Sequence, residues 1–341
     1  MVVMLVNPRE IANIDNFSSQ VKSAVHQEVR QAFTDDIRTE LFRRLHVSGE
    51  MSDLEGFENF VYSVGGQVVR VTHESHRTEE QLLGELEFVS MLSEQGASVA
   101  APIRLPGGNF IESLEGYHAC LFEQAIGTRI RQPIDDAVIT SWGEAIGLFH
   151  RLASGFKPRY PRQDWLADDN HQFHERIPAE QELTLARADE LMAELKTLSA
   201  DPSVFGLIHS DAHPGNFLVD GDKLTFFDFD DCLYAWFGYD LATLVFGIAL
   251  LAEEEADRIA EVKKFLDLFL SGYEKRHRVE ALMLDHMSDL LRLREFSFYG
   301  VVHAFMDVNN LEYDTAQRYM TGRQPLLEQG VPLVDLDFSG Y

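Results

Sequence analysis

The chain has 341 residues, which at roughly 150 residues per domain predicts about two folded units. An apolar share of 45% and a charged share of 25% exclude disordered, collagen-like and low-complexity classes. The 29 basic and 56 acidic side chains leave a net charge of −27, which disfavours nucleic-acid partners and anionic membrane surfaces.

Cysteine content and hydropathy indicate the compartment. Cys120 and Cys232 are too few for a disulfide framework, and the first ten residues lack the pattern of a signal peptide. The longest uncharged apolar run, Leu241 to Ala252, is too short to span a bilayer. We therefore expect a soluble, cytoplasmic protein.

The first third of the chain predicts helices followed by a small sheet. Apolar residues at helical spacing predict one or two helices over 18–46. Two β-rich runs, 59–64 and 67–72, are joined by Gly65-Gly66, a strong hairpin signal. A helix is expected over roughly 79–95, with Gly96 as its C-cap, and further strands over 100–105, 109–114 and 118–124.

Beyond about residue 134 the pattern becomes mainly helical. Helices are expected over 139–153, 180–198, 239–252, 256–273 and within 280–310, interrupted by short strands at 204–210 and from residue 223. This order predicts an α+β fold of two lobes, a small antiparallel-sheet lobe at 1–123 and a larger helical lobe at 124–341. Residues 1 to about 50 would form a helical extension of the first lobe.

The stretch LIHSDAHPGNFLVDGDKLTFFDFDD, residues 207–231, carries the strongest chemical signal. Two strands that end beside each other would bring Asp211, Asn216 and Asp228 to one point. Amide and carboxylate oxygens suit Mg²⁺ held together with substrate phosphates. A separate aspartate can orient a hydroxyl and accept its proton, so the set fits phosphoryl transfer.

These residues resemble the aminoglycoside phosphotransferase and choline kinase-like superfamily, whose members have a protein-kinase-like fold and use ATP and Mg²⁺. The resemblance implies that Asp211 is the catalytic base and that Asn216 and Asp228 are the Mg²⁺ ligands. Ser210 departs from the pattern, since glycine is commoner there. Supporting roles are expected for His209 as a structural brace, for Asp230 beside the metal, and for Asp240 in an Asp-Leu-Ala element that braces the catalytic loop.

The same resemblance implies a nucleotide site in the first lobe. No lysine lies between Lys22 and Lys157, so Arg70 takes the place of the usual strand lysine and would hold phosphate oxygens. Glu85 on the following helix is its expected partner, with Glu87 as the alternative. Phe122, Glu123 and Ala125 lie where the hinge would read adenine through backbone groups.

Four functions follow, and the first is favoured. It is ATP-dependent transfer of the γ-phosphoryl group to a hydroxyl of a small molecule, such as an aminoglycoside, choline, homoserine or a related amino-alcohol or sugar. The net charge favours a cationic acceptor. The alternatives are a Ser/Thr protein kinase of the bacterial stress-response type, and a non-catalytic kinase-like module or a metal-dependent hydrolase, the last suggested by His209-x-Asp211-x-His213.

Overall fold

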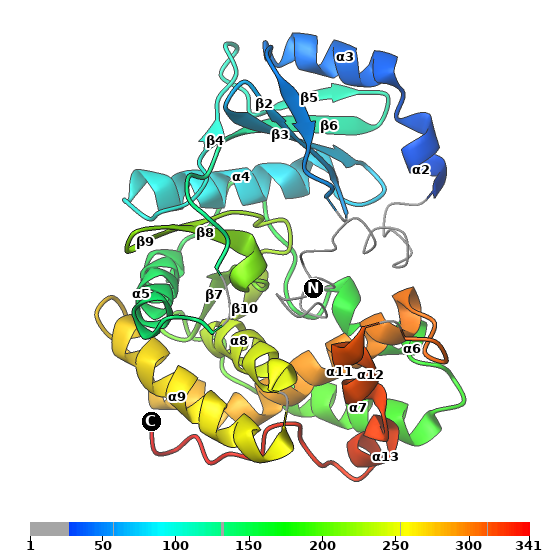
Figure 1. The fold of residues 1–341 in the computed structure, drawn as a ribbon, viewed down its shortest axis with the longest axis vertical. Helices are drawn as coiled ribbons and strands as arrows, with labels where there is room; N and C mark the ends of the chain where they lie inside the picture. Colours follow the sequence, from blue (N-terminus) through cyan, green and yellow to red (C-terminus); the bar gives the residue numbers. More distant parts are fainter. Residues whose placement is uncertain (1–26, 57, 131–132, 253, 312) are drawn as a thin grey trace.

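The computed structural model describes residues 27–341 except 57, 131–132, 253 and 312. The chain forms a smaller, sheet-containing lobe and a larger, mainly helical lobe, with helix α4 (Glu79–Glu94) lying between them (Figure 1). This is the bilobal α+β arrangement that the order of elements predicted. Residues 1–26 of the predicted helical extension lie outside the described residues.

The sheet of the first lobe has the strand order β1-β2-β3-β6-β4, with β5 also paired to β6, and its pairings are antiparallel. The β2–β3 hairpin turns at Gly65-Gly66, where φ is +57° and +82°, values that L side chains disfavour at both positions. The strands are β1 (Met51–Asp53), β2 (Phe60–Val64), β3 (Gln67–His73), β4 (Pro102–Ile103), β5 (Ile111–Leu114) and β6 (Tyr117–Glu123).

Strand β3 sends alternate side chains to opposite faces of the sheet. Val69 and Val71 pack under α3 (Asp35–Arg44), against Leu41 and Leu45. Because side chains alternate along a strand, Arg70 points to the other face, where α4 lies. The short helix α2 (Gln27–Ala32) precedes α3 along the chain. The alternation of side chains along β3 therefore places the Arg70 guanidinium on the face of the sheet that α4 covers.

Helix α4 belongs to both lobes. Thr78 and Gln81 form a capping box at its start. The C-cap is Gln95, and Gly96, the predicted C-cap, is the next residue, with a left-handed φ of +84°. Its Leu82 and Leu86 pack against the sheet. Its other apolar side chains, Phe88, Val89 and Leu92, join the core of the larger lobe. A shift of α4 would therefore disturb two cores.

The larger lobe contains two small antiparallel sheets of two strands each: β7 (Phe205–Ile208) pairs with β10 (Leu233–Trp236), and β8 (Phe217–Asp220) forms a hairpin with β9 (Lys223–Phe226). The predicted strand at 204–210 therefore does not pair with the one that starts at 223. Each pairs with a strand, β10 or β8, that the sequence reading left out.

The helices of the larger lobe lie beside and beneath these two small sheets (Figure 1). They are α5 (Asp136–Ala153), α6 (Phe173–Arg176), α7 (Glu182–Leu195), α8 (Phe237–Leu251), α9 (Glu255–Tyr273), α10 (Ala281–Asp285), α11 (Met287–Phe305), α12 (Asp314–Met320) and α13 (Arg323–Glu328). Their core is rich in aromatic side chains, among them Trp142, Phe246 and Phe298.

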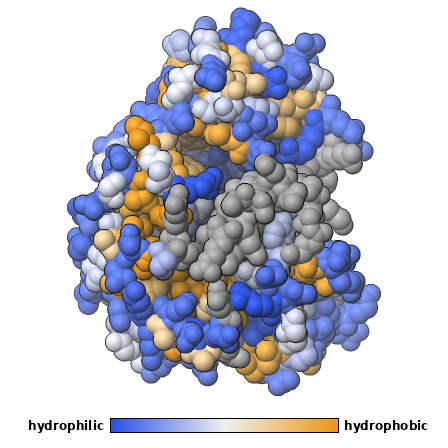
Figure 2. Space-filling model, viewed as in Figure 1, coloured by the Kyte–Doolittle hydropathy of each residue, from blue (hydrophilic) through white to orange (hydrophobic). Residues whose placement is uncertain are grey.

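The surface is largely polar. Hydrophilic residues predominate over both lobes in the face that Figure 2 displays, as expected from the high charge content. Over the described ranges, none of the helices combines the length and apolar character that a bilayer crossing requires.

Candidate active site

The loop that follows β7 holds Asp211, and Asp240 at the start of α8 fixes its backbone. The Asp240 carboxylate accepts hydrogen bonds from the N–H of His209 at 3.1 Å and from that of Ser210 at 2.6 Å. His150 contacts the same carboxylate at 3.1 Å. Asp240 is 1% exposed, so these bonds form away from competing water. The predicted bracing element thus contacts the loop directly.

His209 ties this loop to the one after β9. Its Nδ1 lies 3.4 Å from the N–H of Asp211, and its Nε2 lies 3.2 Å from the Phe227 carbonyl. A ring that accepts at Nδ1 and donates at Nε2 satisfies both contacts. The N–H of Phe227 in turn donates to the Asn216 carbonyl at 3.0 Å. These contacts place Asn216 and Asp228 at adjacent ends of the β8–β9 hairpin.

Asn216 and Asp211 are in direct contact. The Asn216 amide nitrogen donates to the Asp211 carbonyl at 2.8 Å and lies 3.4 Å from its Oδ2. The amide oxygen is then turned away from Asp211, as a cation ligand requires.

Asp228 has the other features of a cation ligand. It is exposed and has a left-handed backbone, φ +63°. Although part of the residue reaches solvent, the protein around its carboxylate removes much of the hydration, and this loss together with the charge of Asp230 raises the pKa of Asp228 to about 7. A bound divalent cation would reverse that shift, so the oxygen donors and the electrostatics both fit such an ion.

The Asp211 carboxylate remains ionised. Burial opposes its charge, but His213 at 3.3 Å and Arg294 at 3.4 Å favour it, and the pKa of Asp211 lies well below its usual value. His213 also accepts a hydrogen bond from the Gly215 N–H at 2.8 Å. The sequence predicted no contact between His213 and Asp211, since His213 was considered as a possible metal ligand of the hydrolase alternative, and Arg294 on α11 belongs to no motif.

Arg70 and Glu85 form a buried, two-pronged ion pair, with N–O distances of 2.8 and 2.6 Å. The two residues are 5% and 0% exposed. The alternative partner, Glu87, points elsewhere and accepts from the backbone N–H of Arg159 at 2.6 Å. The pair joins β3 to α4 at the lobe boundary.

The three hinge positions lie at the end of β6 and just beyond it. The guanidinium of Arg70 lies 5.2 Å from the centre of the Phe122 ring. The N–H of Glu123 donates to the Ala101 carbonyl at 2.9 Å and is therefore occupied. Ala125 follows in the connection to the larger lobe, where it is partly exposed.

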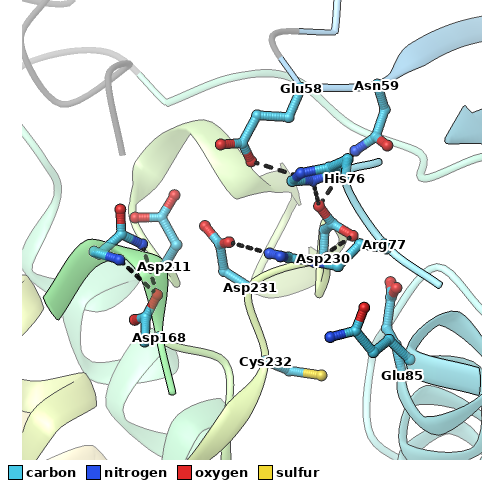
Figure 3. Close-up of polar contacts among 12 residues, drawn as sticks. Glu58, Asn59, His76, Arg77, Glu85, Asp168, Asp211, Asp230, Asp231 and Cys232 are labelled. Carbon is cyan, nitrogen blue, oxygen red and sulfur yellow. Dashed lines mark hydrogen bonds and ion pairs between the residues drawn. The ribbon is translucent and has the colours of Figure 1, made fainter. Parts of the chain in front are cut away.

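Asp230 and Asp231 are engaged by residues of the first lobe (Figure 3). His76 lies 2.7 Å from Asp230, and Arg77 lies 3.0 Å from Asp231. Asn59 also reaches Asp230, at 3.4 Å. These partners are 154 to 171 residues away along the chain, so only the fold reveals them.

The family match and the relatives agree with this geometry. Residues 52–282 match the phosphotransferase enzyme family, and the chain belongs to that family. An amicoumacin kinase of Bacillus subtilis is 28% identical over 92% of this chain and 98% of that protein. A homoserine kinase of Methylobacillus flagellatus is 25% identical over 65% of this chain and 71% of that protein.

A solved structure extends the comparison to the fold. Amicoumacin kinase hAmiN, in complex with AMP-PNP, Ca²⁺ and Ami, gives a TM-score of 0.85 at 26% identity, over 93% of this chain and 99% of that chain. The predicted resemblance and the kinase-like fold are confirmed. The protein is a small-molecule phosphotransferase that uses an alcohol group as acceptor. The hydrolase and non-catalytic interpretations are left without support.

Proposed function

We propose that this protein transfers the γ-phosphoryl group of ATP to a hydroxyl of an amine-bearing small molecule, and that amicoumacin is the first acceptor to test. The observation that carries the proposal is the convergence of Asp211, Asn216 and the Asp228 loop described above, beside the Arg70–Glu85 ion pair. Phosphoryl transfer depends mainly on positioning and on charge stabilisation, which is what such a set supplies.

Asp211 would orient the acceptor hydroxyl and take its proton. Its low pKa makes it a weak base for a free alcohol, so its first role is to accept the hydroxyl hydrogen bond and fix the direction of attack. The ion pair with Glu85 would aim Arg70 at the nucleotide phosphates. Backbone groups near Glu123 and Ala125 would bind adenine.

A divalent cation would bind at Asn216 and Asp228, and it would neutralise charge on the phosphates. The carbonyl and backbone contacts of Phe227 hold these two residues together before any ion binds. Mg²⁺ is the ion we propose.

The proposal that the acceptor carries an amine is supported by acidic groups near Asp211. Burial and, to a smaller extent, the charge of Asp211 raise the pKa of Asp231 against the opposing charge of Arg77, and Asp231 in turn helps to raise the pKa of Glu58. Figure 3 shows Asp211, Asp231 and Glu58 in the same part of the molecule. An ammonium group would relieve this repulsion. The name of the relative that covers 92% of the chain supports amicoumacin as the first choice.

The test is an ADP-release assay with purified protein, ATP and Mg²⁺, using amicoumacin, homoserine, choline and a Ser/Thr-containing protein such as casein in separate reactions. We expect turnover with amicoumacin, with the product carrying one added phosphoryl group by mass spectrometry. Turnover with casein alone would favour the protein-kinase alternative.

The matched variants are Asp211→Asn and Asp220→Asn, the second an exposed acid at the end of β8. Asp211→Asn should retain binding of AMP-PNP and lose at least about a hundredfold in kcat, whereas Asp220→Asn should behave as wild type. Equal kcat values for Asp211→Asn and wild type would remove Asp211 from the reaction.

A further inference from the structure

A short strap of the larger lobe, residues 159–162, lies along helix α4. Three residues of α4, each three positions apart, meet it. Gln81 accepts a hydrogen bond from Arg162 at 3.0 Å, and Glu87 accepts one from the N–H of Arg159 at 2.6 Å. Between them, a Cβ on Gly84 would lie 2.5 Å from the Tyr160 carbonyl. Because residues three apart share a helix face, the strap follows one face of α4.

Arg162 extends from this strap to the loop that follows Asp228. Its guanidinium donates to the Asp230 carbonyl and, at 2.8 Å, to the Cys232 carbonyl, in addition to the Gln81 carbonyl. The residue is 5% exposed. One planar guanidinium therefore binds the backbone of α4 and the backbone of residues 230–232 at the same time. We call residues 228–232 the metal loop.

The strap itself is fixed next to these contacts. The N–H of Tyr234 on β10 donates to the Gln163 carbonyl at 3.0 Å, and the N–H of Trp165 donates to the Tyr234 carbonyl at 2.9 Å. Arg162 therefore projects from a backbone that is paired with β10. Its position is thereby tied to the backbone of the larger lobe.

Because Arg162 is a buried cation, its hydrogen bonds require one relative position of α4 and the loop that follows Asp228. Within the described part of the chain it forms no ion pair with a carboxylate, and its partners are three carbonyl oxygens. A buried cation pays a desolvation cost that only well-aligned hydrogen bonds offset. A movement of α4 or of the metal loop that broke one bond would leave part of the guanidinium unsatisfied.

Resting on the proposed function, we propose that Arg162 is a positioning residue for the nucleotide phosphates and the metal ion. By fixing α4, it holds Glu85, and through Glu85 also Arg70, at a constant position relative to Asp228. The phosphate-binding groups are thereby assembled before ligand arrives. Arg162 acts through other residues and touches neither ATP nor acceptor.

The test compares a nucleotide with a nucleoside, because only the nucleotide reports on phosphates and metal. Arg162→Met should raise the Kd of AMP-PNP with Mg²⁺ about tenfold or more, as changes to residues behind metal ligands typically do. The Kd of adenosine should change less than about twofold, since its site lies at the hinge. Arg162→Lys, which keeps the charge but reaches fewer carbonyls, should fall between wild type and Arg162→Met. Calorimetry measures each Kd.

Arg159→Met is the control, because its side chain is exposed and only its backbone N–H contacts Glu87. It should bind both ligands as wild type does. If Arg162→Met does not fold, Gly84→Ala supplies the second route: its new methyl group would push α4 away from the Tyr160 carbonyl. It should show the same selective loss for AMP-PNP. Where Arg162→Met does fold, combining the two changes should give less than the sum of their effects, because both act through α4.

The outcomes separate this inference from the proposed function. Wild-type protein that fails to bind AMP-PNP with Mg²⁺ would overturn the proposed function and the inference with it. Normal wild-type binding together with equal losses for adenosine and AMP-PNP in Arg162→Met, or no loss for either, would overturn the inference alone, because a merely structural arginine has no reason to distinguish the two ligands.

Discussion

Two residues of the candidate site have left-handed backbones although neither is glycine: Ser210, with φ +69°, and Asp228, with φ +63°. Such conformations cost roughly 1–2 kcal/mol for L side chains and are often found at functional sites. At Ser210 the strain is held by Asp240, whose carboxylate binds the N–H groups of His209 and Ser210. The conformation explains why glycine is the commoner residue at the position of Ser210.

Replacing Ser210 with glycine should therefore stabilise the protein. Removal of the left-handed strain outweighs the extra entropy of an unfolded glycine, and we expect a gain of about 0.5–1 kcal/mol in the free energy of unfolding. Ser210→Ala keeps the strain and should stay within about 0.5 kcal/mol of wild type. Urea denaturation measures all three proteins.

Ser203→Gly is the matched control, because Ser203 is exposed and has an ordinary φ. It should lose about 1 kcal/mol or slightly more, since the entropic cost of glycine remains and the hydrogen bond of the Ser203 side chain to Asp201 is also lost. A loss of stability in Ser210→Gly as large as that in Ser203→Gly would mean that the backbone at Ser210 is not strained.

Asp228 should make cation binding depend on pH near neutrality. Loss of hydration and the charge of Asp230 raise its pKa to about 7 in the folded protein. Below that pH a proton occupies the carboxylate, so Mn²⁺ affinity should fall by up to about tenfold per pH unit. Calorimetric titration of Mn²⁺ at pH 6, 7 and 8 measures it.

The variant Asp228→Asn checks the assignment. It should bind Mn²⁺ weakly with a flat pH profile, and the same pH dependence in wild type and variant would place the titrating group elsewhere.

The raised pKa of Asp228 also determines how the free energy of unfolding changes with pH. Between about pH 4 and 7 the folded chain binds more protons at Asp228 than the unfolded chain does. The metal-free protein therefore loses stability as pH rises through that window, and Asp228→Asn removes this loss.

Local motifs explain why the central site residues could be predicted from the sequence. Asp211 and Asn216 lie five positions apart in one loop, and Asp228 follows the next hairpin, so short loops alone bring them together. Arg162 and Arg294 contact that site from 68 to 83 positions away. No spacing rule connects such residues, because packing of whole elements brings them into contact.

At the scale of elements, apolar periodicity predicted the long helices well and the short strands poorly. Helix α5 and helix α9 lie close to their predicted ranges. Strands β8 and β10 have four residues each, too few for a period-two pattern to be distinguished from a loop. Their pairing, β8 with β9 and β10 with β7, is seen only in the folded structure.

The packing of α5 against α9 depends on glycines that bring the two backbones together. A Cβ on Gly143 of α5 would lie 1.9 Å from the Phe269 carbonyl, and one on Gly272 of α9 would lie 1.9 Å from the Thr140 carbonyl. Gly147 makes a similar approach to the Tyr273 carbonyl, at 2.5 Å. The obstacle in each case is backbone, so a side chain cannot rotate away to make room.

Gly143→Ala and Gly272→Ala should each cost at least about 2–3 kcal/mol in the free energy of unfolding, because the helices must separate along a shared core. Gly300→Ala, on α11, is the comparison: its new Cβ would lie 3.2 Å from the Cβ of Arg176, a tight contact that a shift of a few tenths of an ångström relieves. Its cost should stay below about 1 kcal/mol. Thermal and urea denaturation measure all three. Similar losses in all three would show that helical glycines matter here for a reason other than the approach of α5 to α9.

At the scale of the whole molecule, the net charge of −27 acts on every ligand that approaches. A protein of this charge attracts a cationic acceptor and repels an anionic nucleotide over distances comparable to the Debye length. The acidic side chains near Asp211, among them Asp231 and Glu58, add to the same field at the site itself.

The two substrates should therefore respond to salt in opposite directions. Raising NaCl from 50 to 500 mM shortens the Debye length from about 14 to about 4 Å, so the KM of an amine-bearing acceptor should rise several-fold. The KM of ATP with Mg²⁺ should fall or stay constant, because screening relieves the repulsion of the chain while the Arg70 contact is buried. Asp231→Asn should weaken the salt dependence of the acceptor KM and leave that of ATP unchanged. Steady-state kinetics at matched pH measures both. An acceptor KM that ignores salt in wild type would mean that the amine is not recognised by charge, and that the acidic groups around Asp211 serve the fold and not the substrate.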